Sequence, residues 1–148
     1  MTAAAEADVV AKALCKLIDP KAKAESINSY QSVLMLAVPM LAKATVELPR
    51  YGLSFQPWLN WKKPKTPPEW WSGNNKVKHH RAEHFKQGNL RNVLNAVAGL
   101  LLLLLVYYGE SQHLLVTKPR IYVPGAFGLL QDDGLLLSVP HGAKLPWA

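Results

Sequence analysis

The sequence predicts a mainly α-helical fold: a helical bundle around a central apolar helix, with an ordered proline- and tryptophan-rich loop and a short β-like C-terminal segment. Three observations predict this fold. Apolar residues recur with helical spacing in the first 47 residues. Residues 90–108 are apolar on nearly every helical face, which is typical of a buried helix. Five prolines between residues 48 and 69 exclude regular helix there.

The length and composition indicate a globular protein. A chain of 148 residues favours one domain with its own core. Apolar residues make up 49% and charged residues 18%, which excludes a disordered or highly charged chain. We expect a helical domain over residues 1–110. An extended or β-hairpin tail over residues 111–148 is expected to pack on that domain.

The positive charge is concentrated in one segment. The chain has a net charge of +7, and residues 50–91 hold nine Lys or Arg against two Glu, which is 9 − 2 = +7. A segment of this kind attracts phosphate groups or an acidic partner. Solubility alone is the other interpretation. The N-terminal segment lacks the basic start of a signal peptide, so we expect a cytoplasmic protein.

Two helices are predicted in the first third of the chain. The first covers residues 3–18 and ends at Asp19-Pro20. Its expected apolar stripe is Val9, Val10, Ala13, Leu14 and Leu17. The second covers residues 25–47, and Pro39 should kink it or divide it in two. Cys15 is the only cysteine, so it forms no intrachain disulfide and is expected to be a small core residue.

The loop over residues 48–69 contains Trp58 and Trp61, and Trp70 and Trp71 follow it directly. Aromatic side chains argue against a disordered linker. We therefore expect an ordered loop that lies against the helices and is anchored by its tryptophan rings. These rings either fill the core or stack on nucleic-acid bases, and core filling is the favoured interpretation.

A third helix is predicted to start at a cap formed by Ser72 or Asn74 and to reach about Gln87. Gly88-Asn89 indicates a break, with Asn89 capping a new helix; the alternative is one long helix that tolerates Gly88. Residues 90–108 should then form the central helix, surrounded on all sides. Their uncharged run of 13 residues, 96–108, is shorter than the roughly 20 needed to span a membrane. A membrane-associated protein that uses residues 92–109 is the runner-up interpretation.

The C-terminal segment has β character. Apolar runs at residues 114–116, 121–123 and 135–139 alternate with turn signals, of which Asp132-Asp133-Gly134 is the clearest.

The candidate functional residues lie between residues 75 and 89. Helical spacing places Asn75, Lys78 and His79 along one side of a helix. Arg81 follows Lys78 by one turn, and His84 follows Arg81 by one turn. Three hypotheses compete. A zinc site would use His80 and His84, but the sequence offers no obvious third ligand beyond His113 or His141. A phosphate or RNA site would use the cations. In a purely structural role, Asn75 and His79 would bond the proline-rich loop. We predict no metal and no cofactor.

A resemblance follows from the same residues. The pattern PxWW…NxVKHxR…F…NL…NVLNAVAGL is similar to that of a group of small uncharacterised bacterial proteins and, more loosely, to helical domains of the HEPN superfamily. The residues that match are Pro68–Trp71, Asn75, Val77–His79, Arg81, Phe85, Asn89-Leu90 and Asn92–Leu100.

The HEPN resemblance implies a helical bundle, frequent dimerisation and, in active members, metal-independent RNA cleavage by an Arg and a His separated by four to six residues. Here only two residues separate Arg81 from His84, and His79 precedes Arg81. The resemblance therefore supports RNA or nucleotide binding more than catalysis. It also implies a role in bacterial stress, phage defence or a toxin–antitoxin pair.

These expectations define a function hypothesis. A HEPN-like module would handle RNA, or another phosphate-bearing ligand, as a homodimer or with a partner protein. In its enzymatic form, a metal-independent ribonuclease, His79 is the base and His84 a second acid or base. Lys78 and Arg81 stabilise the phosphorane, and Asn75 orients His79. A non-catalytic scaffold subunit of an oligomer is a further alternative.

Overall fold

The computed structural model describes residues 2–79, 83, 86 and 88–108. Within them the fold is mainly α, as predicted. The four helices are α1 (Thr2–Ile18), α2 (Ile27–Ala37), α3 (Glu69–His79) and α5 (Leu90–Tyr108). One antiparallel hairpin joins β1 (Val46–Leu48) to β2 (Leu53–Phe55). The β segments expected at residues 114–139 lie outside the described residues.

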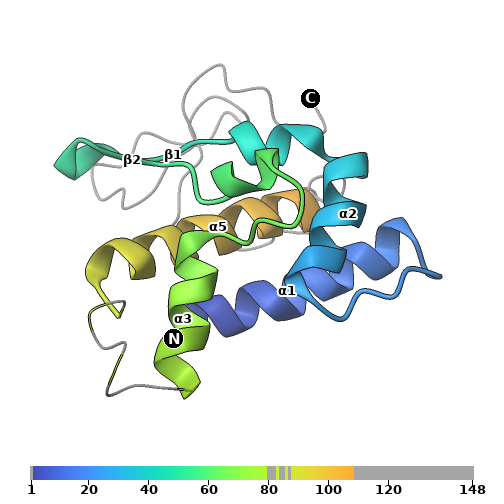
Figure 1. Ribbon diagram of the computed structural model, residues 1–148. Coiled ribbons are helices and arrows are strands. Elements are labelled where there is room, and N and C mark those ends of the chain that lie inside the picture. The colour runs from blue at the N-terminus through green and yellow to red at the C-terminus, as the bar shows by residue number, and fades with distance from the viewer. Residues whose placement is uncertain (1, 80–82, 84–85, 87, 109–148) are drawn as a thin grey trace.

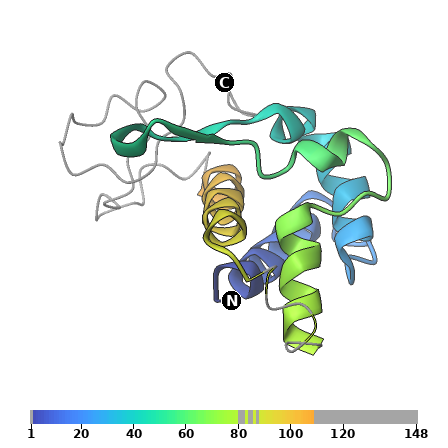
Figure 2. The same cartoon turned by 60° about the vertical axis from the view of Figure 1, so that its left-hand side comes forward.

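Helix α5 forms the centre of the arrangement (Figure 1). Figure 2 looks nearly along its axis, with the hairpin above it, α3 beside it and α1 below. Ala98 and Leu103 in its middle are fully buried. Its first turn is not, since Leu90 is 71% exposed. The expectation that α5 is surrounded on all sides is therefore wrong at this end, where Arg91 and the nearby asparagines need contact with water. It is also wrong at the other end, where Tyr107 and Tyr108 are exposed.

Helix α1 packs along α5 through small side chains. Its buried face is Ala4, Ala7, Ala11, Leu14 and Cys15. The expected stripe is wrong at Val9 and Leu17, which are 60% and 64% exposed, whereas Leu14 on that stripe is buried as expected. Alanines allow two helices to approach closely and bury backbone as well as side chains. The close approach of α1 to α5 therefore determines which face of α1 is buried, and burial of the largest apolar side chains does not.

Pro39 divides the second predicted helix, as expected. Helix α2 starts at a Ser26–Ser29 capping box and ends at Ala37, and a short 3₁₀ turn, η1 (Pro39–Lys43), follows. Gln31 is the buried polar residue of this helix. Its side-chain nitrogen donates hydrogen bonds to the carbonyl oxygens of Trp61 at 3.1 Å and Lys63 at 2.7 Å. This amide therefore ties α2 to the proline-rich loop.

The loop is ordered, but its first residues form a hairpin with the segment before it, which the sequence did not predict. Strand β1 begins at Val46, so the last two residues of the predicted second helix are in a strand. Val46 pairs with Phe55 and Leu48 with Leu53, and the short turn between the strands, η2 (Pro49–Tyr51), ends at Gly52 with φ of 61°. A positive φ of this size favours glycine. Strands of three residues are too short for an alternating pattern to be recognised. A further 3₁₀ turn, η3 (Leu59–Lys62), carries Trp61.

The tryptophans fill the core, as the sequence favoured. Trp58, Trp61, Trp70 and Trp71 are all buried. The Trp58 ring lies 4.3 Å from the Trp61 ring and 5.2 Å from the Trp70 ring between centroids. Trp58 Nε1 donates to the Gly99 carbonyl at 3.2 Å, and Trp70 Nε1 donates to the Pro57 carbonyl at 2.8 Å. The loop, α3 and α5 therefore share one aromatic cluster.

Helix α3 begins at Glu69, which corrects the predicted start at Ser72 or Asn74. The Ser72 amide already donates to the Pro68 carbonyl at 3.0 Å. Burial of the two adjacent tryptophans extends the helix toward the loop. At α5 the predicted cap is confirmed, since the Asn92 amide donates to Asn89 Oδ1 at 2.9 Å. The alternative of one long helix through Gly88 is wrong.

Candidate functional site

Helix α3 has two dissimilar halves. Trp70, Trp71 and Gly73 are buried in its first half. Lys76, Lys78 and His79 form the last turn, and all three side chains are exposed. Cations near a helix C-terminus are favoured by the helix dipole. The first half therefore fixes the helix, and the last turn presents positive charge to solvent at the projecting end seen in Figure 1.

Three of the five predicted site residues, Asn75, Lys78 and His79, are described and exposed. Arg81 and His84 lie outside the described residues. Asn75 and His79 are one helical turn apart on α3, a spacing at which side chains can interact. Within the described ranges no hydrogen bond joins these two side chains, and none links either of them to the proline-rich loop. The structural interpretation of these two residues therefore has no support in the described contacts.

The described residues contain no cluster of three His, Cys, Asp or Glu that could hold a metal ion. The histidines of the zinc hypothesis, His80, His84, His113 and His141, lie outside this part of the chain. Cys15 offers no nucleophile, because burial raises the pKa of its thiol to about 11 and keeps it protonated near neutral pH.

A second candidate site, which the sequence did not predict, is a cavity of about 720 Å³ near the start of α5. Its walls come from β2 and the residues after it, from η3, from the start of α3 and from the first two turns of α5. The polar side chains that line it are Thr45, Ser54, Gln56, Asn60, Glu69, Arg91, Asn92 and Asn95. Arg91, Asn92 and Asn95, at the start of a helix that is apolar beyond them, were the signal that could have indicated it.

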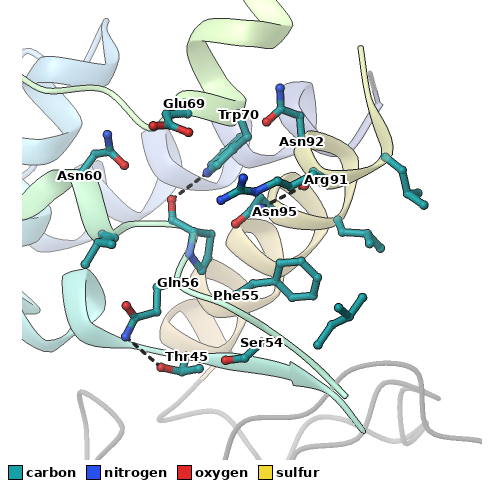
Figure 3. A pocket seen from close by; sticks show the side chains of 15 residues that line it. Thr45, Ser54, Phe55, Gln56, Asn60, Glu69, Trp70, Arg91, Asn92 and Asn95 are labelled. Atoms are coloured by element: carbon teal, nitrogen blue, oxygen red, sulfur yellow. Dashed lines mark hydrogen bonds between the residues drawn. The ribbon is translucent and has the colours of Figure 1, made fainter. Parts of the chain in front are cut away.

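Charged and amide groups converge on this cavity (Figure 3). The guanidinium of Arg91 reaches over it from α5, and Glu69 and Asn60 lie on the opposite side. Arg91 and Glu69 are both exposed, and no ion pair joins them in the part of the chain that the structure describes. Asn95 Nδ2 donates to the Arg91 carbonyl at 3.0 Å, and Gln56 Nε2 donates to Thr45 Oγ1 at 3.2 Å. The cavity thus offers both donors and acceptors to a ligand.

Comparison with known proteins gives no relative: no protein family, no curated protein and no solved structure matches this chain. The HEPN resemblance therefore remains a hypothesis that stands on the residues alone.

Proposed function

We propose that this protein is a HEPN-like helical module of a bacterial stress or phage-defence system that handles RNA. The observation that carries the proposal is the division of α3. Its buried tryptophans hold the helix rigidly, while Lys76, Lys78 and His79 are exposed in its last turn. The only acid on α3, Glu69, lies at the opposite end of the helix. Cations held in a fixed turn can bind the phosphates of an RNA backbone, and such contacts dominate the affinity of proteins for nucleic acids.

In the enzymatic form of the proposal, His79 takes the proton of a ribose 2′-hydroxyl and the 2′-oxygen attacks the adjacent phosphorus. The bond from phosphorus to the 5′-oxygen breaks, and His84 protonates that leaving oxygen. Lys78 and Arg81 stabilise the charge of the phosphorane, and Asn75 orients His79. The products are a 2′,3′-cyclic phosphate and a 5′-hydroxyl. Because the histidines transfer the protons and the cations stabilise the charge, this form of the proposal uses no metal. The binding form keeps the same cations and omits these steps.

Binding is tested by fluorescence anisotropy with a labelled single-stranded RNA over a range of salt concentrations. We expect Lys76→Ala/Lys78→Ala to weaken binding about tenfold. The slope of log K against log salt should fall by about 1.4, because each lost contact with a single strand accounts for about 0.7. The matched control is Lys12→Ala/Lys16→Ala, which removes two exposed lysines from α1 and should leave binding unchanged. Equal losses in both variants would contradict a specific RNA surface on α3.

Cleavage is tested with tRNA and a mixed RNA pool in the presence of EDTA. Activity that survives EDTA and disappears in His79→Ala supports the enzymatic form. Activity unchanged in both His79→Ala and Arg81→Ala contradicts it. An inactive protein that still binds RNA supports the binding form.

A second candidate function is membrane association. Helix α5 has 19 residues and is the one described helix that is long and apolar enough to cross a membrane. Only 33% of the most apolar 18-residue stretch of this helix is buried. The core helix of a globular protein can be equally long and apolar. The contacts of α5 with α1 and α3 favour that role. The two candidates are distinguished by expression without detergent: sedimentation with membranes supports the second, and a soluble folded protein opposes it.

A further inference from the structure

We propose that the 720 Å³ cavity beside α5 binds one guanine nucleotide of the RNA, with Arg91 on the phosphate and Glu69 on the base. This inference rests on the proposed function in taking RNA as the source of the nucleotide. It concerns residues outside the cationic turn of α3, so the two proposals can fail separately.

The size and the apolar lining of the cavity suit this ligand class. Small-molecule and cofactor sites occupy about 300–1,000 Å³, and this cavity lies within that range. Leu59 and Leu90 are exposed apolar residues that line it, at 40% and 71% exposure. These side chains provide an apolar surface for a base, whereas Trp70 is buried and its indole nitrogen is bonded to Pro57.

Arg91 carries the phosphate contact. Its guanidinium extends over the cavity (Figure 3) and forms no ion pair within the described residues. A guanidinium presents a planar fork of donors that matches two phosphate oxygens. The positive end of the α5 dipole lies at the same turn and favours an anion there. The overall charge of +7 brings anionic ligands to the protein.

Glu69 determines which base the cavity binds. A carboxylate only accepts hydrogen bonds, and it can accept two parallel N–H groups. Among the four RNA bases, guanine alone offers such a pair, the N1–H and the exocyclic N2–H, on its Watson–Crick edge. Single-stranded RNA exposes this edge to proteins. Glu69 faces the cavity from the first turn of α3, opposite Arg91 (Figure 3).

The amides complete the set of polar groups. Asn95 uses its nitrogen on the Arg91 carbonyl, which leaves its oxygen to accept from a ribose hydroxyl. Asn60 lines the same side as Glu69 and has both a donor and an acceptor. Lys76 follows Glu69 by seven positions, or about two helical turns, so the two lie on one side of α3 about 10 Å apart. A strand with its guanine in the cavity therefore extends toward the cationic turn.

The proposal is tested by calorimetric titration of the full chain with four small probes: GMP, IMP, AMP and guanosine. IMP lacks the exocyclic amino group of guanine, and guanosine lacks the phosphate. We expect GMP to bind at least tenfold more tightly than each of the other three. Arg91→Ala should make GMP and guanosine equal in affinity. Glu69→Gln should lower the ratio of GMP affinity to IMP affinity at least tenfold. Both residues are exposed, so neither change should unfold the protein.

Matched controls remove the same charges elsewhere. Arg50→Ala and Glu6→Gln lie outside the cavity lining and should leave every affinity within twofold. Lys78→Ala should also leave GMP binding unchanged, although it weakens RNA binding. Equal affinities for GMP and IMP, or for GMP and guanosine, would overturn the proposal. Binding of triglycine in place of GMP would overturn it as well, in favour of a peptide site.

The RNA source is tested with the trinucleotide GpGpG. We expect it to bind at least tenfold more tightly than GMP, and Lys76→Ala should remove most of this gain. Tight GMP binding with no gain for GpGpG would overturn RNA as the source and leave a free nucleotide. Loss of RNA binding in the α3 variants with intact GMP binding would instead confirm that the two surfaces are separate.

Discussion

The two halves of α3 differ in what fixes their side chains, and the difference separates stability from binding. In the first half, packing leaves Trp70 and Trp71 little freedom, because neighbouring rings and a carbonyl acceptor surround them. In the last turn, Lys76, Lys78 and His79 contact mainly solvent. Substitutions of the buried tryptophans in the first half should therefore change the free energy of unfolding, and substitutions of the exposed residues in the last turn should change ligand affinity alone.

The largest effect is expected for Trp70→Ala. This change removes a buried indole that contacts Trp58 and Trp71 and donates to the Pro57 carbonyl. It should lower the free energy of unfolding by about 3–5 kcal/mol. Lys78→Ala, on the same helix, should change it by no more than about 0.5 kcal/mol. Urea denaturation followed by circular dichroism measures both values, and similar losses in the two variants would contradict the division of α3.

The sequence predicted a helix over the later residues of α3 but not its first turn. Helical spacing placed Asn75, Lys78 and His79 along one side of that helix, and all three side chains are exposed. It could not show that α3 begins at Glu69, because the burial of Trp70 and Trp71 depends on a loop and on Gly99, some thirty residues away along the chain. The cavity was missed for the same reason. Its walls join β2, η3, α3 and α5, and no local pattern reports which distant segments meet.

The prediction for α1 failed for a related reason. The stripe with Val9 and Leu17 has the larger apolar residues, yet the alanine face is buried. The hydrophobic effect alone favours the larger side chains. Close packing against α5 favours the smaller ones, and in this pair of helices close packing decides the orientation. The burial of Cys15 was predicted correctly, because the cysteine lies beside the alanines on that face.

A smaller effect is expected for Gly99→Ala. A Cβ added at this position would lie 2.9 Å from a ring carbon of Trp70 and 3.5 Å from Trp58. The rings are held by two hydrogen bonds and cannot shift freely. Overpacking of this kind costs about 1–3 kcal/mol. Ala98→Gly, at the neighbouring buried position, is a control that creates space instead of a clash. A melting temperature for Gly99→Ala equal to that of the wild type would contradict the close approach of α3 to α5.

The buried thiol provides a pH test of the core. Burial raises the Cys15 pKa from 9.0 to about 11. Above pH 9 the unfolded chain therefore loses its thiol proton while the folded protein retains it. Stability conferred by this group is complete below pH 9 and declines between pH 9 and 11, by roughly 1 kcal/mol per pH unit. Cys15→Ala should show a shallower decline than the wild type over this window in urea denaturation. Parallel declines would show that the thiol is not desolvated.

The smallest of these effects is expected for Asn89→Ala, and it connects the packed and exposed regions. The Asn89 side chain accepts from the Asn92 amide, and its nitrogen donates to the Lys86 carbonyl at 3.0 Å. Loss of this cap should lower stability by about 1 kcal/mol. The cap also fixes the turn that holds Arg91, so GMP affinity should fall although Asn89 does not line the cavity. Asn89→Asp retains the acceptor for the amide and should restore both quantities. A variant that loses stability but keeps full GMP affinity would show that Arg91 is positioned by its own packing, and the cap would then serve the helix alone.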